Sequence, residues 1–367
     1  MSRKHQITLI ALTDQDVAAG DLAHMKAFVE DIHIFKITRW SLPFYLMKAY
    51  VTGQPLQVGY FYRSHIHRQI RKLLEEIRPD HIYCQLVRMA EYVRDFPLPK
   101  TLDYMDCFSA GMGRQAQEGP KWQAPIYQRE SRLLFDYQQE VYPDFTFHTI
   151  ISDQDRQLLD PAGKLEIQII PNGIDTDFFR PVMRIPSAEV VFVGNMGYFP
   201  NVKAAEYLVR EIMPEVWKVK PEVQVVIAGA RPTAQVTALG KDARVKVTGW
   251  IEDIRDAYTA GKLFVAPIFT GSGQQNKILE AMAMGRPCIT TLLVNNAIQA
   301  ITGEQIEVAD TPRDFARQIL RLLQDEVLYQ SRVKASRHFV EKYMDWTRAV
   351  EGLEQNFSGM PSPQSLE

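Results

Sequence analysis

The second half of this 367-residue chain alternates short apolar runs with helical patterns, which limits the folds it can adopt. Three of the runs are AEVVFVGNM (188–196), VQVVIAGA (223–230) and LFVAPI (263–268), each apolar almost throughout. A strand that is apolar on both faces must be covered on both sides, as in a parallel sheet flanked by helices. The sequence therefore predicts a doubly wound α/β domain here.

The first half shows the same alternation less regularly. The stretch SHIHRQIRKLLEEI (64–77) predicts an amphipathic helix, because helical spacing places on one face Ile66, Ile70, Leu73, Leu74 and Ile77. An apolar run, HIYCQL (81–86), follows it and predicts a strand. We therefore expect a second α/β domain, joined to the first within LEIQIIPNGIDTDFFRP (165–181), where Pro-Asn-Gly indicates a turn.

These patterns divide the chain into four parts. Residues 1–168 form the predicted N-terminal Rossmann-like domain and residues 169–344 the predicted C-terminal one. The stretch DWTRAVEGLEQNF (345–357) predicts a last helix that can cross back to the N-terminal domain. Residues 358–367, SGMPSPQSLE after Phe357, are expected to be a disordered tail.

Composition excludes several classes of protein. The formal charge of −2 gives no general attraction to nucleic acid, so no nucleic-acid partner is expected. The three cysteines, Cys84, Cys107 and Cys288, are far apart in apolar runs, which indicates buried thiols in a reducing compartment. No apolar run approaches the ~18 residues that span a bilayer. We expect a soluble, cytoplasmic protein.

One stretch combines a glycine-rich turn with charged residues, FTGSGQQNKILEAMAMGRPCIT (269–290). Gly271 and Gly273 allow close approach of a ligand, and a helix that begins near 274–276 offers free N–H groups to a phosphate. Lys277 in the first turn opposes the helix dipole unless an anion binds nearby. Glu280 lies on the same face, where a carboxylate can accept hydrogen bonds from ribose hydroxyls.

The alternative is a surface Lys–Glu pair at i, i+3 on an ordinary helix, worth a few tenths of a kcal/mol. The glycine loop and the flanking strands favour a nucleotide diphosphate instead.

The set of motifs resembles a known family. GSGQQNKILEAMAMGRPCITT resembles the nucleotide-binding signature of GT-B glycosyltransferases, in particular the large retaining family 4. IIPNGIDTDFF is similar to that family's segment between domains, and VFVGNMGYFPNVKAAEYL, VVIAGARP and VTGWIEDIRDAY resemble its bacterial exopolysaccharide sugar transferases. The resemblance implies a GT-B fold, two Rossmann-like domains facing a cleft.

The resemblance also implies a donor site. Glu280 matches the second glutamate of the family's E-x7-E motif, which holds the ribose, whereas Ser272 stands where the first glutamate would be. The loop around Trp250 matches the one that frames the base, although Trp250 could equally be a core aromatic. The donor-site residues implied are Gly194, Asn195, Asn201, Arg231, Gly249, Trp250, Ile251, Gly271, Ser272, Gly273, Gln274, Asn276, Lys277 and Glu280.

The chain departs from the family at charged positions. Many members carry an arginine after the glycine of Val-Gly and a lysine shortly after, but here Asn195 follows Gly194. Lys277 is therefore the candidate for the positive charge that stabilises the diphosphate leaving group. No suitably placed Asp-x-Asp motif occurs, so we expect no metal and no other cofactor.

The N-terminal domain carries acceptor recognition in this fold. Met105 stands where members often have histidine, and Asp106 keeps the aspartate, with a hydroxyl-binding role and an N-cap or turn role both open. Arg88 is an acceptor-side candidate that can reach a phosphate or simply be solvated. We expect the first strand–helix unit usual in the family to be missing.

A basic and aromatic region gives a possible contact with an anionic membrane. Its candidates are Trp40, Phe44, Tyr45, Met47, Arg63, Arg68, Arg71 and Lys72. The alternative is an ordinary amphipathic helix with a solvated basic face.

The resemblance implies a glycosyltransferase that moves a sugar from a UDP- or GDP-sugar to a bacterial surface or exopolysaccharide glycan, free or lipid-linked, with retention. Lys277, Glu280 and Asp106 are the expected catalytic residues. Two alternatives stay open: a catalytically inactive GT-B binding subunit and a sugar-nucleotide epimerase of the same fold.

Overall fold

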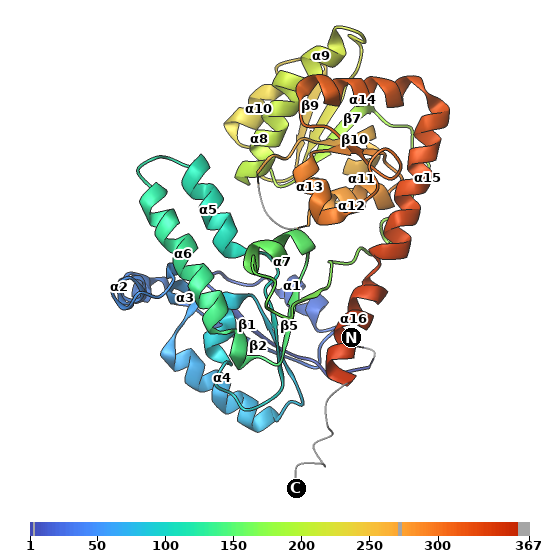
Figure 1. Ribbon diagram of the computed structural model, residues 1–367. Helices are drawn as coiled ribbons and strands as arrows, with labels where there is room; N and C mark the ends of the chain where they lie inside the picture. Colours follow the sequence, from blue (N-terminus) through green and yellow to red (C-terminus); the bar gives the residue numbers. More distant parts are fainter. Residues whose placement is uncertain (3, 271–273, 359–367) are drawn as a thin grey trace. The chain divides into compact units, whose positions relative to one another are not determined.

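The computed structural model describes residues 1–2, 4–270 and 274–358 (Figure 1). The chain divides into two compact units. We call them the N-terminal unit, Met1–Ile170 with Val350–Glu367, and the C-terminal unit, Pro171–Ala349. The division at 170/171 lies within the segment 165–181, and the expected tail from 359 onward lies outside the described residues.

The C-terminal unit is built on a six-stranded parallel sheet in the order β12-β11-β10-β7-β8-β9. Its strands are β7 (Ala188–Val193), β8 (Val225–Ala228), β9 (Val245–Gly249), β10 (Gly261–Ala266), β11 (Cys288–Thr290) and β12 (Glu307–Val308). The chain runs outward from β7 through β8 to β9, then returns to the other side of β7 with β10. Strand order therefore reverses between β7 and β10, which is where open α/β sheets bind ligands.

Helices cover this sheet on both faces (Figure 1). They are α8 (Phe199–Tyr207), α9 (Met213–Trp217), α10 (Ala234–Leu239), α11 (Ile254–Thr259), α12 (Asn276–Ala283), α13 (Leu292–Ile298), α14 (Pro312–Gln324) and α15 (Glu326–Tyr343). A π turn, Leu208–Ile212, connects α8 to α9 just before Pro214, which has no N–H to continue the α-helical bonding. The central strands β7, β8 and β10 are buried except at Glu189 and Lys262, as their apolar runs predict.

The N-terminal unit contains two parallel sheets rather than one. The first pairs β1 (Thr8–Thr13) with β2 (Asp31–Lys36), and the second has the order β3-β4-β5-β6. The strands of the second are β3 (Ile82–Gln85), β4 (Lys100–Asp103), β5 (Phe147–Ile150) and β6 (Gln168–Ile169). The predicted α/β class is confirmed, but β1 and β2 are only partly buried, so they form a small separate sheet.

The helices of this unit are α1 (Ala19–Met25), α2 (Leu42–Thr52), α3 (Leu56–Phe61), α4 (Ser64–Ile77), α5 (Phe108–Glu118), α6 (Ala124–Glu140), α7 (Asp153–Leu159) and most of α16 (Trp346–Ser358). Short 3-10 helices lie at Arg39–Ser41, Val87–Tyr92 and Tyr142–Asp144. The three cysteines are buried and unpaired, as predicted. Among the described residues, no helix is both long and apolar enough to cross a membrane.

Candidate functional site

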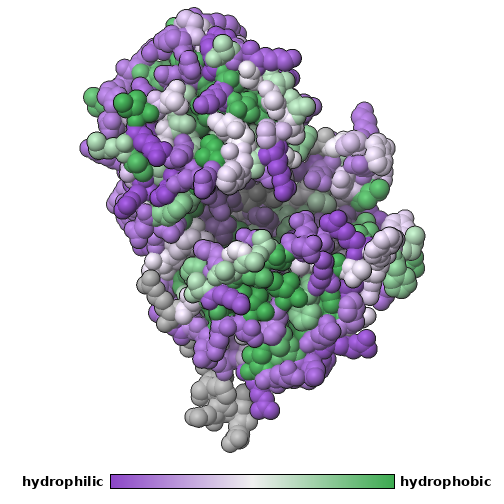
Figure 2. Space-filling view, turned by 180° about the vertical axis from the view of Figure 1, so that it is seen from behind, coloured by the Kyte–Doolittle hydropathy of each residue, from purple (hydrophilic) through white to green (hydrophobic). Residues whose placement is uncertain are grey.

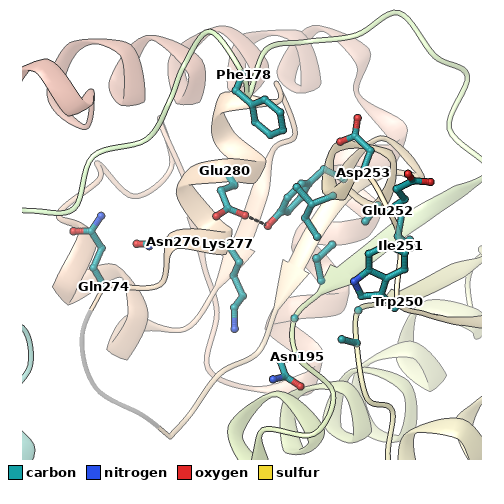
Figure 3. Close-up of a pocket in the computed structure, with 17 residues that line it drawn as sticks. Phe178, Asn195, Trp250, Ile251, Glu252, Asp253, Gln274, Asn276, Lys277 and Glu280 are labelled. Carbon is teal, nitrogen blue, oxygen red and sulfur yellow. Dashed lines mark hydrogen bonds between the residues drawn. The ribbon is translucent and has the colours of Figure 1, made fainter. Parts of the chain in front are cut away.

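A cavity of about 860 Å³ opens in the C-terminal unit at the carboxyl ends of its central strands (Figure 3). It lies where β7, β8 and β9 end and where α11 and α12 begin. The residues that line it are Phe178, Val193, Gly194, Asn195, Gly229, Ala230, Trp250, Ile251, Glu252, Asp253, Ile254, Ala257, Tyr258, Gln274, Asn276, Lys277 and Glu280. The cavity thus occupies the crevice that the strand order predicts.

Glycines end three neighbouring strands at this edge. Gly194 follows β7, Gly229 follows β8, and Gly249 is the last residue of β9. Gly229 has a φ of +137°, and a Cβ on it would lie 1.8 Å from the carbonyl oxygen of Gly194. The backbones of the first two loops therefore touch, which only glycine at 229 permits, and the cavity wall there is bare main chain.

Lys277 is the second residue of α12 and points into the cavity (Figure 3). Its Nζ donates a hydrogen bond of 2.5 Å to Oδ1 of Asn201, and it lies 5.8 Å from the centre of the Phe192 ring. Burial lowers the pKa of the Lys277 ammonium to about 8. Within the described ranges no carboxylate lies at ion-pair distance from this ammonium, and the charge of Glu280 one turn away raises its pKa by less than burial lowers it.

Asn201 fixes the position of that ammonium. It is a buried residue of α8, and its Nδ2 donates a 3.0 Å hydrogen bond to the backbone oxygen of Asn195. Asn195 in turn accepts at Oδ1 from the N–H of Gly197. The amide of Asn201 therefore links the loop after β7 to Lys277, while Lys203, the next basic residue, is exposed and pairs with Glu206.

Glu280 lies one turn after Lys277 but does not pair with it. Its Oε2 accepts a short hydrogen bond from the hydroxyl of Tyr258, a buried residue of α11 (Figure 3). Burial raises the pKa of the Glu280 carboxyl, although the bonds from Tyr258 and the charge of Lys277 oppose this. The alternative of a surface Lys–Glu pair is therefore wrong, because both side chains are largely buried and have separate partners.

The other residues predicted for the donor site do not all line the cavity. Trp250 is 70% exposed and lines the cavity, so the alternative of a core aromatic is wrong. Ile251 and Asn276 line it too, as does Gln274, which donates to the backbone oxygen of Asn172. Arg231 is an exposed residue with a left-handed backbone (φ of +56°), and it does not line the cavity. The predicted site residues Gly271, Ser272 and Gly273 lie outside the described residues.

Asp106 follows β4 in the N-terminal unit. It is not an N-cap, since α5 begins at Phe108 after Cys107, whose side chain makes no capping bond. Burial raises the pKa of the Asp106 carboxyl to about 6, and the charge of Asp155 adds to this, while Arg114 opposes it. The structure thus presents a carboxyl that titrates near neutral pH.

Replacing Asp106 by asparagine is expected to stabilise the protein above pH 6. The folded state disfavours the charged carboxyl, so wild-type stability falls as pH rises from the unfolded pKa near 4 to about 6. Urea unfolding should show a gain of about 1–3 kcal/mol at pH 7 that vanishes near pH 4. The exposed Asp80→Asn serves as a control, and equal gains in both variants would contradict this account.

Arg88 lies in the 3-10 helix after β3. Its guanidinium stacks on Phe61 at 4.4 Å and on Phe108 at 5.4 Å from the ring centres, and burial lowers its pKa. The alternative of a freely solvated arginine is therefore wrong.

The basic residues that we expected to face a membrane do not form one exposed surface. Arg63 is buried, and its guanidinium donates to the backbone oxygens of Gly59, Tyr60 and Tyr62. The other basic residues lie on α4, where Arg71 and Lys72 have acidic neighbours. Arg63 does not contribute to a charged surface, because it is buried and one nitrogen of its guanidinium is bonded to three backbone oxygens inside the unit.

In the part of the chain that the structure describes, no group of three or more His, Cys, Asp or Glu side chains is placed to hold a metal ion.

Sequence comparisons match part of the C-terminal unit to a known family. The family model for glycosyl transferases group 1 matches residues 187–325. The putative glycosyltransferase YtcC of Bacillus subtilis is 22% identical over 278 residues, 65% of this chain and 66% of that protein. The matched stretches span between 37% and 66% of the length of the curated relatives.

Solved structures match nearly the whole chain. Sucrose-phosphate synthase from Thermosynechococcus elongatus matches with a TM-score of 0.69 at 16% identity, over 96% of this chain and 98% of that one. Anabaena Alr3699/HepE in complex with UDP and glucose matches with a TM-score of 0.66 at 13% identity, over 96% and 92%. At these identities the likeness is one of fold. Residues 187–325 therefore match the group 1 glycosyltransferases, and the chain has the GT-B fold.

Proposed function

We propose that this protein transfers a sugar from a nucleotide-sugar donor to a glycan acceptor, with the donor bound in the cavity of the C-terminal unit. The observation that carries the proposal is Lys277, a largely buried ammonium with no carboxylate partner in the described ranges. Such a charge is costly to bury unless an anion completes the site. The diphosphate of the donor supplies that anion.

Glu280 then binds the ribose. Tyr258 holds its carboxylate by a hydrogen bond, one helical turn after Lys277. In a nucleotide the ribose is bonded directly to the diphosphate, so a diphosphate at Lys277 brings the ribose near Glu280. The exposed ring of Trp250 faces the same cavity and offers an apolar surface to the base. A UDP-sugar is the first donor to test, since a structure of similar fold is a complex with UDP and glucose.

The chemical step is proposed to rest on stabilisation of the leaving group. The bond between the anomeric carbon and the diphosphate oxygen breaks, and its electron pair stays on the diphosphate, where Lys277 offsets the developing charge. An acceptor hydroxyl oxygen bonds to the anomeric carbon, and the proton of that hydroxyl passes to the departing diphosphate. We propose a metal-independent reaction that retains the anomeric configuration, the latter from resemblance to the family.

For the acceptor we propose a bacterial surface or exopolysaccharide glycan, free or lipid-linked. Asp106 would hydrogen-bond a sugar hydroxyl and the stacked guanidinium of Arg88 a phosphate. We place the reaction in the cytoplasm, at the inner face of the membrane.

Nucleotide binding tests this proposal directly. One of UDP-, GDP- and TDP-sugars should raise the melting temperature in a saturable way, and the shift should be lost in Lys277→Ala and in Glu280→Ala, each compared with its own ligand-free form. Lys203→Ala, an exposed lysine of the same unit, should keep the full shift. Absence of a shift with every nucleotide would overturn the donor site. Binding without sugar transfer would favour an inactive binding subunit, and inversion of the free nucleotide sugar an epimerase.

Replacing Tyr258 by phenylalanine should weaken nucleotide binding by about 3–10-fold, the value of one hydrogen bond. Loss of the bond also raises the pKa of Glu280 further, so the deficit should be larger at pH 5 than at pH 8. Calorimetric titration at both pH values measures it. Tyr207→Phe, which alters a tyrosine outside the cavity lining, should bind as the wild type does. A Tyr258→Phe deficit that does not change with pH would show a merely structural effect.

A further inference from the structure

Helix α2 is apolar except for Lys48 and Thr52, and only one of its sides is packed. Ala49 is buried, and Gly59 of α3 lies so close that a Cβ on it would be 2.5 Å from the Ala49 Cβ. Leu42, Tyr45 and Leu46 share this inner side and are partly buried. The helix is therefore seated firmly on the N-terminal unit along one face.

The opposite side carries a line of exposed apolar side chains, which we call the outer stripe. Its members follow helical spacing and are Phe44 (68% exposed), Met47 (64%) and Val51 (75%) of α2, with Trp40 (95%) in the 3-10 helix that precedes α2. A helix that is apolar all round is normally buried. Here half of it is left in solvent, and exposed apolar surface of this kind marks an interaction site.

Two arginines hold α2 in place. The buried guanidinium of Arg63 lies 4.1 Å from the centre of the Tyr45 ring. Arg129 of α6 stacks on the Tyr50 ring at 4.4 Å and donates a 2.9 Å hydrogen bond to the Tyr50 backbone oxygen. The helix is thus fixed at its middle and its end, and the outer stripe is presented by a stable scaffold.

The charges around the outer stripe are positive. Residues 32–74 contain no Asp or Glu and seven Lys or Arg. Lys36 and Arg39 pair with Asp16 and Asp14, but Lys48 on α2 has no acidic partner in the described ranges. Arg129, at the end of the stripe, likewise meets only Tyr50 there. An apolar line flanked by unpaired cations complements a surface of anionic headgroups above acyl chains.

We propose that the outer stripe of α2 docks the N-terminal unit on an anionic lipid bilayer. The side chains of the stripe enter the boundary between headgroups and acyl chains while Lys48 and Arg129 contact lipid phosphates. In Figure 1, α2 lies at the outer edge of its unit, and the space-filling view from behind shows hydrophobic surface at the corresponding edge (Figure 2). A single convex ridge suits insertion into a lipid surface, whereas a protein partner usually takes such a helix into a groove of its own. This proposal does not depend on the donor site.

Co-sedimentation of the full chain with vesicles tests it. Binding to vesicles of phosphatidylcholine with phosphatidylglycerol should exceed binding to phosphatidylcholine alone by at least about tenfold, and should weaken as salt is raised. The double variant Phe44→Ser/Met47→Ser should lose at least about tenfold in binding to the anionic vesicles. Lys48→Glu should lower anionic binding without changing the neutral background.

A matched control comes from the C-terminal unit, where Met183 and Ile185 are fully exposed as well. Met183→Ser/Ile185→Ser should bind vesicles as the wild type does. Thermal unfolding confirms that each variant is folded, and since all the changed side chains are exposed, no loss of stability is expected. Equal losses in the control and the stripe variant would overturn the proposal, as would absence of vesicle binding. Concentration-dependent association that Phe44→Ser/Met47→Ser abolishes would instead make the stripe an interface between copies of the chain.

Discussion

Replacing Lys277 by methionine is expected to lower kcat for sugar transfer by about 10²–10³-fold. The ammonium points into the cavity beside Asn201, and no other cationic side chain belongs to the described lining of the cavity. Loss of the only such charge would leave the departing diphosphate without its counter-charge. A variant that keeps wild-type kcat would contradict the proposed role.

The same change should stabilise the nucleotide-free protein. Because the pKa of Lys277 is lowered to about 8, the folded state binds fewer protons than the unfolded state between pH 8 and the ordinary lysine pKa near 10.5. Wild-type stability should therefore rise across that window, and the cost of burying the charge is fully present below pH 8. Lys277→Met removes the cost, so its melting temperature should exceed that of the wild type at pH 7 and approach it near pH 10.

Nucleotide affinity gives an independent check. The diphosphate favours the charged lysine, so wild-type affinity should fall as pH rises above about 8, where free Lys277 loses its proton. Lys277→Arg keeps its charge throughout, and its affinity should not depend on pH in this range. Calorimetric titrations from pH 7 to pH 10 compare the two. The same pH dependence in both proteins would exclude Lys277 as its source.

Replacing Gly229 by alanine is expected to destabilise the C-terminal unit by about 3–5 kcal/mol. The new Cβ would lie 1.8 Å from the Gly194 carbonyl oxygen, and a φ of +137° is strained for any residue with a side chain. Relief requires the loops after β7 and β8 to separate, and these loops form the cavity wall. Urea unfolding measures the loss, and binding by the fraction that stays folded should also weaken.

Gly240→Ala is the matched control in the same unit. Gly240 caps α10 with a φ of −69°, and a Cβ there would be 3.4 Å from its nearest neighbour, an ordinary contact. Its stability should stay within about 1 kcal/mol of the wild type. If Gly229→Ala behaved like this control, the close approach of the two loops would not be a constraint on the site.

Two predictions from local sequence patterns hold because their physical causes are local. The apolar runs at 188–196, 223–230 and 263–268 contain strands β7, β8 and β10 of a parallel sheet, since both faces of each run need cover. Lys277 and Glu280 share a cavity because three residues of helix bring them onto one face. The glycine loop before them lies outside the described residues.

The partners of those side chains could not be predicted from such patterns. Tyr258 is 22 residues from Glu280 in the chain, and Asn201 is 76 residues from Lys277, so neither pairing has a periodic signal. The crossover connections of the parallel sheet bring α8, α11 and α12 to the same edge of the sheet. This tertiary arrangement decides that Asn201 bonds Lys277 and that Tyr258 bonds Glu280. In the sequence, Tyr258 cannot be distinguished from an ordinary apolar residue of a helix, because the sequence does not show which group its hydroxyl bonds.

Besides hydrogen-bond partners, the burial of individual side chains also depends on long-range packing. From the sequence we predicted that Arg63 belongs to a basic surface, and we could not decide whether Trp250 lies in the core or in the cavity. Arginine and tryptophan both occur in buried and in exposed positions, so residue type alone does not settle this. Contacts with α2 and α3 bury Arg63, whereas Trp250, just after the end of β9, is exposed. The sequence by itself therefore determined the α/β class and the pair Lys277 and Glu280, which depend on spacing of a few residues. Tertiary structure alone decided which charges are buried, what holds them, and that the outer stripe of α2 stays in solvent, because burial depends on what distant segments cover.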